Sequence, residues 1–469
     1  MLVLTLANAL YIATAYAITV WLAHHLGPRD FGRYGVVAAI VTLVGIVVTR
    51  GIPVAATRAI AADPGDARRT LAAALRVLAP LAVGVTALAA LTAVPVAEIL
   101  GDSGLRVPLL IGSAAALSYA AQALPLAWFA GLHQYARQAV AQGWYAVSRL
   151  VAIVAGGLIA GLSGAIAGFV IAPAVAVLAT LGGLRLRGKP VLPEPAQAAG
   201  GEPVTGRALL REAGPLVVVA GLVSLLLTLD LLAFKRVGTA EDAGRYAAAA
   251  TIAHVPFFLL RSAPVVLMPA VAAATALGGR GRDPRSPHVR AEIRSGVGDA
   301  IVLLALPTAL LVTLGDRALE LIFGESYAVA GLVVAPLALA TAAVTLYSVF
   351  VAVETALGSL RIAVVTGLLG ALLVTAGAAF GGSGSDVPRA AWAVAVAAVL
   401  AALLHAASLW ARTGSFVPAR ALAAVPLAAA LAAPTLLAPS GRAWFLVAAV
   451  ASSSVYAAIA LRLRLVRLR

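Results

Sequence analysis

The feature that most constrains this chain is the recurrence of long apolar segments along its whole length. Runs of 18 or more residues with few charges follow one another from the first residue to about position 461. Each run is long enough to cross a lipid bilayer as a helix. Only 11% of the residues are charged, against about 25% in an ordinary soluble domain. The sequence therefore predicts an all-α polytopic membrane protein.

The apolar runs predict about fourteen transmembrane helices. The predicted ranges are 2–23, 34–56, 71–94, 107–130, 140–161, 163–182, 208–234, 244–270, 297–315, 328–350, 360–380, 388–410, 418–437 and 442–461. The first run lacks the basic start of a secretion signal and is too long for the apolar part of one. We therefore interpret it as the first transmembrane helix.

The distribution of basic residues predicts the orientation of these helices. If the N-terminus lies in the cytoplasm, the connections and tail on that side carry 21 Arg and Lys residues, and the opposite connections carry nine. Short cytoplasmic loops are enriched in basic residues, so both termini are predicted to be cytoplasmic. The same rule accounts for most of the net charge of +15 without a nucleic-acid partner.

A short charged turn recurs in the two halves of the chain. The tripeptide Gly-Arg-Tyr opens a predicted helix at 32–34 and again at 244–246, and each copy is followed by the pattern Arg-x-x-Pro, at Arg50 and Arg261. The copies are six predicted helices apart, which preserves orientation and indicates a parallel repeat about the membrane normal. We therefore predict two pseudo-symmetric lobes of six helices, followed by two C-terminal helices.

The predicted organisation has four parts. It comprises an N-terminal lobe at 1–183, a cytoplasmic linker at 184–207, a C-terminal lobe at 208–411, and the last two helices with a basic cytoplasmic tail at 412–469. The linker is rich in proline, glycine and charged residues, as linkers commonly are. No connection has enough apolar residues to build a soluble domain, so the function must lie in or at the membrane.

Charged residues inside the predicted helices are candidates for a functional site. A charge at bilayer depth is unfavourable unless it faces a cavity or a partner. Arg50 and Arg261 both lie in the cytoplasmic half of their helices, one from each lobe. Guanidinium groups bind phosphate oxygens in pairs, so these arginines could bind a substrate phosphate. The alternatives are snorkelling to the inner interface or an interhelical salt bridge.

Two further side chains are substrate-binding candidates. Arg149 could line the same cavity, with an ion pair as the alternative. His254 lies seven residues before Arg261, which places both on one face of a regular helix. His254 could therefore donate to a substrate, although a packed and hydrogen-bonded histidine is the simpler interpretation.

Two acidic residues are candidates for ion coupling. Asp230 lies near the outer end of the seventh predicted helix, and Glu354 lies near the inner end of the tenth. A carboxylate at either place could bind the cation that drives export. The simpler interpretation is a local ion pair, with Lys235 or Arg236 for Asp230 and with Arg361 for Glu354.

The order of these motifs resembles that of the oligosaccharide-lipid flippases of the multidrug/oligosaccharidyl-lipid/polysaccharide exporter superfamily. The matching segments are LGPRDFGRYGVV at 26–37, LDLLAFKRVGTAEDAGRYAAA at 229–249, FGESYAVAG at 323–331 and ETALGSLR at 354–361. The resemblance implies two six-helix lobes, a central cavity, and export of undecaprenyl-diphosphate-linked sugars. Members of this family often have a short basic stretch before the first helix, so the natural chain could begin upstream of Met1.

The absence of several sequence motifs excludes some classes of function. The sequence has no phosphate-binding loop for ATP, no metal-binding cluster and no cysteine. We therefore expect no enzyme activity, no cofactor and no metal. The expected function is flipping of an undecaprenyl-diphosphate-linked oligosaccharide in a bacterial cytoplasmic membrane, with a polysaccharide polymerase or glycosyltransferases as further partners. The alternatives are a cation-coupled multidrug exporter on the same scaffold and a non-transporting scaffold of a polysaccharide assembly complex.

Overall fold

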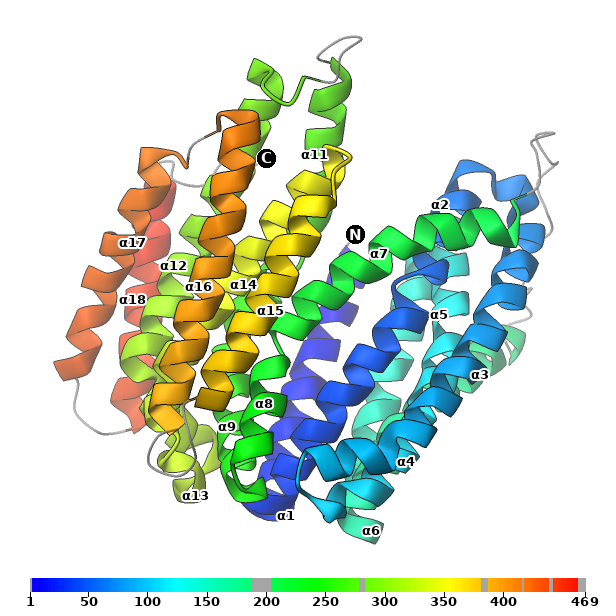
Figure 1. The fold of residues 1–469 in the computed structure, drawn as a ribbon, viewed down its shortest axis with the longest axis horizontal. Coiled ribbons are helices and arrows are strands. Elements are labelled where there is room, and N and C mark those ends of the chain that lie inside the picture. The colour runs from blue at the N-terminus through cyan, green and yellow to red at the C-terminus, as the bar shows by residue number, and fades with distance from the viewer. Residues whose placement is uncertain are drawn as a thin grey trace. The chain divides into compact units, whose positions relative to one another are not determined.

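The structure, a computed structural model, describes residues 2–186, 204–277, 283–380, 387–415, 417–437 and 442–462. Every regular element in these ranges is a helix, which confirms the predicted all-α fold (Figure 1). The chain divides into two compact units, Met1–Gly221 and Leu222–Arg469. The division falls inside a helix, whereas the sequence suggests the linker at 184–207, part of which lies outside the described residues. The exact lobe boundaries and the rotational repeat therefore stay predictions.

The first unit is built from six helices and the beginning of a seventh. They are α1 (Leu2–Thr49), α2 (Ile52–Ala62), α3 (Ala67–Ile99), α4 (Arg106–Ser113), α5 (Ala115–Gly131), α6 (Tyr135–Leu186) and the first part of α7 (Gly206–Leu226). Short 3-10 turns, η1 (Pro64–Asp66) and η2 (Ser103–Leu105), precede α3 and α4. An apolar core between α1, α2, α3, α5 and α7 holds this unit together.

Two helices of the first unit each contain two membrane crossings. The backbone of α1 turns at Gly27, whose φ is +70°, and that of α6 turns at Gly161, whose φ is +55°. Glycine adopts such left-handed angles without a steric penalty. The described residues contain 11 apolar segments long enough to cross a membrane, and two of these segments, of 60 and 49 residues, are long enough to cross twice. With the shorter apolar helix at 447–460, the count agrees with fourteen crossings.

The two halves of α6 pack against each other backbone to backbone. A Cβ atom on Gly164 would lie 1.9 Å from the carbonyl oxygen of Gly156, and one on Gly168 would lie 2.2 Å from that of Ala152. Neither distance is sterically possible, so these positions require glycine. Small residues that allow helices to approach closely are typical of membrane-protein interfaces.

The second unit is built around α14. Its helices are α8 (Leu229–Val237), α9 (Ala240–Ala253), α10 (Val255–Leu260), α11 (Ala263–Leu277), α12 (Pro287–Phe323), α13 (Glu325–Ala328), α14 (Gly331–Ala356), α15 (Arg361–Phe380), α16 (Val387–Thr413), α17 (Ala419–Ala432) and α18 (Arg442–Arg462), with a 3-10 turn η4 (Ala433–Leu437). About two thirds of the apolar span of α14, 67%, is buried. Helices α11, α12 and α16 contribute to the core that surrounds it.

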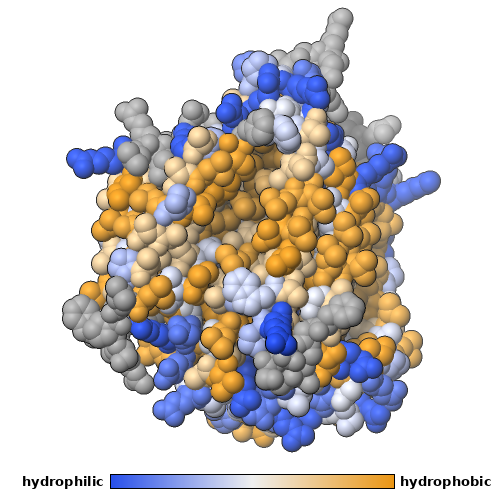
Figure 2. Space-filling model, turned by 60° about the vertical axis from the view of Figure 1, so that its left-hand side comes forward, coloured by the Kyte–Doolittle hydropathy of each residue, from blue (hydrophilic) through white to orange (hydrophobic). Residues whose placement is uncertain are grey.

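The surface of the protein is apolar where a bilayer would contact it. Large hydrophobic side chains such as Leu91, Ile159, Val265 and Leu332 are 70–84% exposed. On the face shown in Figure 2, hydrophobic side chains form a broad band, and hydrophilic side chains gather above and below it. Exposed apolar surface on this scale marks contact with lipid. The protein is therefore a multi-pass membrane protein.

The arginine of the repeated Gly-Arg-Tyr turn contacts the corresponding connection between helices in both units. Arg33 donates two hydrogen bonds to the carboxylate of Asp102, at 2.8 and 3.0 Å, in the connection between the next two predicted helices. Arg245 forms an ion pair with Glu241 at 2.7 Å and donates to the carbonyl oxygen of Ser326, which lies in the corresponding connection of the second unit. In each unit the motif arginine therefore anchors one connection to the start of a helix.

Candidate functional site

The two arginines of the Arg-x-x-Pro pattern each lie at a break in a helix. Arg50 falls between the end of α1 and the start of α2, and Arg261 falls between α10 and α11. Both side chains are exposed. Pro53 and Pro264 are the second residues of the helices that follow, where a missing backbone N–H is tolerated. The pattern thus encodes an interrupted helix with an arginine at the interruption.

An interrupted helix places a partial positive charge beside each arginine. The backbone dipoles of a helix add up to a positive N-terminal end, and transporters use such half-helix ends to bind anionic groups of a substrate. Arg50 precedes the N-terminal end of α2, and Arg261 precedes that of α11. At each of these two interruptions, an arginine and a helix N-terminus therefore both favour an anion.

Arg149 on α6 is the most deeply buried arginine of the first unit's core, with 6% of its surface exposed. Its guanidinium carbon lies 4.3 Å from the ring centroid of Tyr11 and 5.6 Å from that of Tyr145. Its Nη2 donates to the carbonyl oxygen of Tyr11 at 3.1 Å. The two rings stack on each other with their centroids 5.8 Å apart. Cation–π contacts of this kind stabilise a cation in an apolar setting.

No carboxylate neutralises Arg149 in the part of the chain that the structure describes. Its contacts there are tyrosines, with Tyr34 and Tyr119 also within electrostatic range. The buried Nε–H has no hydrogen-bond partner among the described residues. The residue lies mid-helix, about 21 Å along α6 from Tyr135. Burying a cation without a counter-ion is unfavourable, and charged residues at such positions in membrane proteins commonly have a function. Arg149 therefore stays a candidate site residue.

A stripe of polar side chains continues from Arg149 along one face of α6. Gln138, Gln142, Tyr145 and Arg149 follow one another at intervals of four, three and four residues, the spacing of one helix face. The carbonyl oxygens of both glutamine side chains are buried without partners among the described residues. Sequence reasoning missed the two glutamines, although their regular spacing in an otherwise apolar helix was a usable signal.

His254 lies at another interruption, between α9 and α10. Its side chain is partly buried, and its backbone N–H donates to the carbonyl oxygen of Ala250 at 2.9 Å. The chain is interrupted again at Arg261. The seven-residue spacing therefore does not by itself place the two side chains on one face, and the substrate role of His254 stays a prediction.

Asp230 is paired with the tyrosine of the second Gly-Arg-Tyr copy. Its carboxylate is 5% exposed, and Oδ2 accepts a hydrogen bond of 2.9 Å from the hydroxyl of Tyr246. The Tyr246 ring stacks on Phe234, with a centroid distance of 4.9 Å. No ion pair joins Asp230 to Lys235 or Arg236 in the described structure. Its Oδ1 is buried and has no hydrogen-bond partner there.

Glu354 at the end of α14 forms an ion pair with Arg412 of α16 rather than with Arg361. The glutamate side chain is fully buried, and that of Arg412 is 31% exposed. Arg285 donates to the carbonyl oxygens of Ala411 and Arg412, at 3.0 and 3.1 Å, at the end of α16. The partner was missed because α14 and α16 are neighbours in space and not along the chain.

A buried histidine in the second unit was also not among the candidate residues predicted from the sequence. His405 is fully buried in α16, and its Nδ1 shares a 2.7 Å hydrogen bond with the hydroxyl of Thr366 on α15. The ring of Tyr347 lies 5.2 Å away, centroid to centroid. No group of three or more His, Cys, Asp or Glu side chains could hold a metal within the described ranges.

Comparison with known proteins places the chain in a family. Residues 1–274, more than half of the chain, match the sequence model of a family described as polysaccharide biosynthesis protein. The chain belongs to this family. No curated protein matches this chain.

Solved structures share the fold of this polysaccharide biosynthesis protein. The lipid II flippase MurJ in an inward closed conformation matches with a TM-score of 0.74 and 10% identity, over 98% of this chain and 99% of that one. An inward-facing multidrug resistance transporter of the MATE family matches with a TM-score of 0.69 and 13% identity, over 86% and 94%. A transporter of the MOP superfamily from Pyrococcus furiosus matches with a TM-score of 0.58 and 14% identity, over 88% of this chain and 94% of that one. The chain thus shares the all-α fold of these solved structures, as expected from its motifs.

Proposed function

We propose that this polysaccharide biosynthesis protein flips an undecaprenyl-diphosphate-linked oligosaccharide from the cytoplasmic to the outer leaflet of a bacterial cytoplasmic membrane. It would do so by alternating access, without enzyme activity. The observation that carries the proposal is the charge of the deep side chains. Arg149 is a buried cation without a carboxylate partner among the described residues, whereas Glu354 is already paired with Arg412.

A diphosphate fits these cations better than a neutral or cationic substrate does. A guanidinium group presents several N–H donors in one plane and binds two phosphate oxygens at once. The exposed Arg50 and Arg261 lie beside helix N-termini, where an anion is also stabilised by the backbone. A polysaccharide polymerase or glycosyltransferases would supply or consume the lipid-linked glycan.

A cation-coupled multidrug exporter is the second candidate. The observation that favours it is the buried Oδ1 of Asp230, which has no hydrogen-bond partner among the described residues and could accept a cation. The same atom could instead bind the ion that couples export of an anionic substrate. A multidrug exporter would lose transport of cationic drugs when Asp230 is replaced by Asn, and would keep it when Arg149 is replaced.

The test measures precursor export in variants of the arginines. Replacing both Arg50 and Arg261 by Ala should leave the protein in the membrane but cause lipid-linked precursor to accumulate on the cytoplasmic leaflet. Arg50 and Arg261 are exposed, and the bound substrate would bury their contacts to its phosphates. Losing such contacts would weaken binding by roughly 2–5 kcal/mol, which is about 30-fold or more in affinity. Lys should rescue only in part, because it keeps the charge and loses the planar fork.

The matched control is Arg106→Ala, because Arg106 is exposed and is paired with Glu98 on the predicted outer side. This variant should export normally. Normal export by the doubly substituted Arg50→Ala, Arg261→Ala protein would exclude this pair as substrate ligands. A non-transporting scaffold would support polysaccharide assembly unchanged in every one of these variants.

A further inference from the structure

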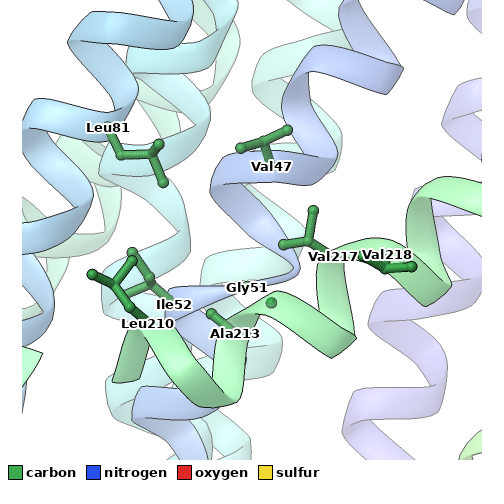
Figure 3. Close-up of a pocket in the computed structure, with 9 residues that line it drawn as sticks. Val47, Gly51, Ile52, Leu81, Leu210, Ala213, Val217 and Val218 are labelled. Carbon is green, nitrogen blue, oxygen red and sulfur yellow. The ribbon is translucent and has the colours of Figure 1, made fainter. Parts of the chain in front are cut away.

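An apolar groove lies against the break between α1 and α2, where Gly51 and Ile52 line it (Figure 3). Its volume is about 310 Å³, and its walls come from three parts of the first unit. Val47 and Gly51 lie at the break, Leu81 comes from α3, and the face of α7 from Leu210 to Val218 closes the opposite side. Apolar side chains and backbone form almost the whole lining, so the groove suits a hydrocarbon rather than a sugar.

Gly51 allows α7 to lie directly against the break. A Cβ atom at this position would meet the Cγ2 of Val217 at 2.7 Å and the Cβ of Ala213 at 3.2 Å. The residue is therefore both the floor of the groove and the immediate neighbour of Arg50. The groove thus borders the N-terminal end of α2, and Arg50 directly precedes its lining residue Gly51 in the chain.

We propose that this groove holds the first isoprene units of a prenyl diphosphate, with the diphosphate beside Arg50. An amphiphile with an anionic head joined directly to a hydrocarbon chain matches an apolar groove whose lining residue Gly51 directly follows a basic residue at a helix N-terminus. The inference rests on the proposed function for the presence of such a lipid, and it adds where the chain of the lipid binds. The binding site lies wholly within the first unit, Met1–Gly221.

The size of the groove limits how much of the chain it can hold. A cavity of about 150 Å³ holds one benzene molecule, so about 310 Å³ holds roughly twice as many carbon atoms, or two isoprene units. The α7 wall from Leu210 to Val218 is about 12 Å long at 1.5 Å per residue. The remainder of the prenyl chain would extend into the lipid.

The groove would distinguish a prenyl chain from other lipid chains by shape rather than by hydrophobicity. A hydrocarbon chain leaves an environment in the bilayer that is as apolar as the groove itself, so its transfer brings little hydrophobic gain. Methyl branches at regular intervals distinguish a prenyl chain from a straight acyl chain, and close packing discriminates between such shapes. The position of the bound chain is therefore a sharper observable than its affinity.

The first experiment is photo-crosslinking of the full chain in nanodiscs. The probe is a prenyl diphosphate with a diazirine on its second isoprene unit. Mass spectrometry should find adducts in the peptides of Val47, Leu81 or Leu210 to Val218, and excess unlabelled undecaprenyl diphosphate should remove them. Adducts only elsewhere in the chain would overturn the proposal, and so would removal by a phospholipid with straight acyl chains to the same extent.

The second experiment fills the groove. Gly214 lines it, and a Cβ at this position would meet no atom within 4 Å, so Gly214→Leu adds a side chain whose first carbon has free space. Overfilling an occupied site of this kind weakens binding by roughly five- to a hundredfold, and the adducts should fall accordingly. Gly84→Leu is the matched control, because Gly84 is an open helical position on α3 outside the groove.

The outcomes separate this inference from the proposed function. Inorganic pyrophosphate has no hydrocarbon chain to occupy the groove. It should therefore protect Arg50 from chemical modification of its guanidinium group equally in the wild type and in Gly214→Leu. Normal precursor export with no competed adduct in the groove would overturn the inference and leave the flippase function intact. Competed adducts in a protein that exports no lipid-linked glycan would support the groove and refute the proposed function. Equal adducts in Gly214→Leu and Gly84→Leu would also overturn the groove assignment.

Discussion

The ion pair between Glu354 and Arg412 should respond unequally to loss of its two partners. Glu354 is fully buried, whereas Arg412 is 31% exposed. Replacing Arg412 by Ala leaves a buried carboxylate without its cation. Replacing Glu354 by Gln leaves a guanidinium group that can still reach solvent. We therefore expect Arg412→Ala to destabilise the protein much more than Glu354→Gln.

The magnitude follows from the burial of the partner that remains. Removing one member of a buried ion pair costs about 3–5 kcal/mol, which should apply to Arg412→Ala. Losing a hydrogen bond to an arginine that is partly solvated costs nearer 1 kcal/mol. For a unit of roughly 250 residues, about 2–4 °C of melting temperature corresponds to each kcal/mol. The expected losses are therefore roughly 6–20 °C for Arg412→Ala and roughly 2–4 °C for Glu354→Gln.

The assay is thermal melting of the purified full chain in detergent, with precursor export measured in parallel. The double variant Glu354→Leu, Arg412→Leu should recover most of the stability lost in Arg412→Ala, because it removes both charges together. Equal melting temperatures for Arg412→Ala and Glu354→Gln would refute this reasoning. A Glu354→Gln protein with unchanged stability and no export would instead support a role in ion coupling.

Three further predictions concern single features. Thr239→Ala removes the capping box at the start of α9 and should destabilise the second unit by about 1 kcal/mol, measured by thermal melting. Arg149→Lys keeps the charge but loses the flat stacking on Tyr11; export should fall while the amount of protein in the membrane is unchanged, and wild-type export would contradict a substrate role. A reporter fused after Arg290 should be cytoplasmic and one after Gly104 should be external, and the same location for both would contradict the predicted orientation.

The apolar runs were sufficient to predict the helices, because a transmembrane helix is determined by the composition of its own segment. The breaks in those helices were harder to locate. The Arg-x-x-Pro pattern contains Pro53 and Pro264, but the interruptions lie two to three residues before these prolines, at the arginines themselves. Proline fits the first turn of a new helix, so its position marks where the next helix begins rather than where the bend occurs.

The candidate side chains could be named from the sequence, but their partners could not. The simpler interpretation of Asp230 was an ion pair with Lys235 or Arg236. It accepts a hydrogen bond from Tyr246 instead, which lies sixteen residues later in the chain. Glu354 was expected to pair with Arg361, and its partner Arg412 lies 58 residues away. Such contacts depend on which helices are neighbours, and helix composition alone carries little information about that.

The glycine contact inside α6 has a consequence for how this part of the protein can move. Two helices that touch through carbonyl oxygens and missing side chains fit in a single register, because a shift by one residue would bring a methyl group against the backbone. The two halves of α6 therefore cannot slide along each other and should move as one rigid body. Bending relative to the preceding helix would then occur at the first end of α6, where the chain reverses through His133 with a φ of +56°.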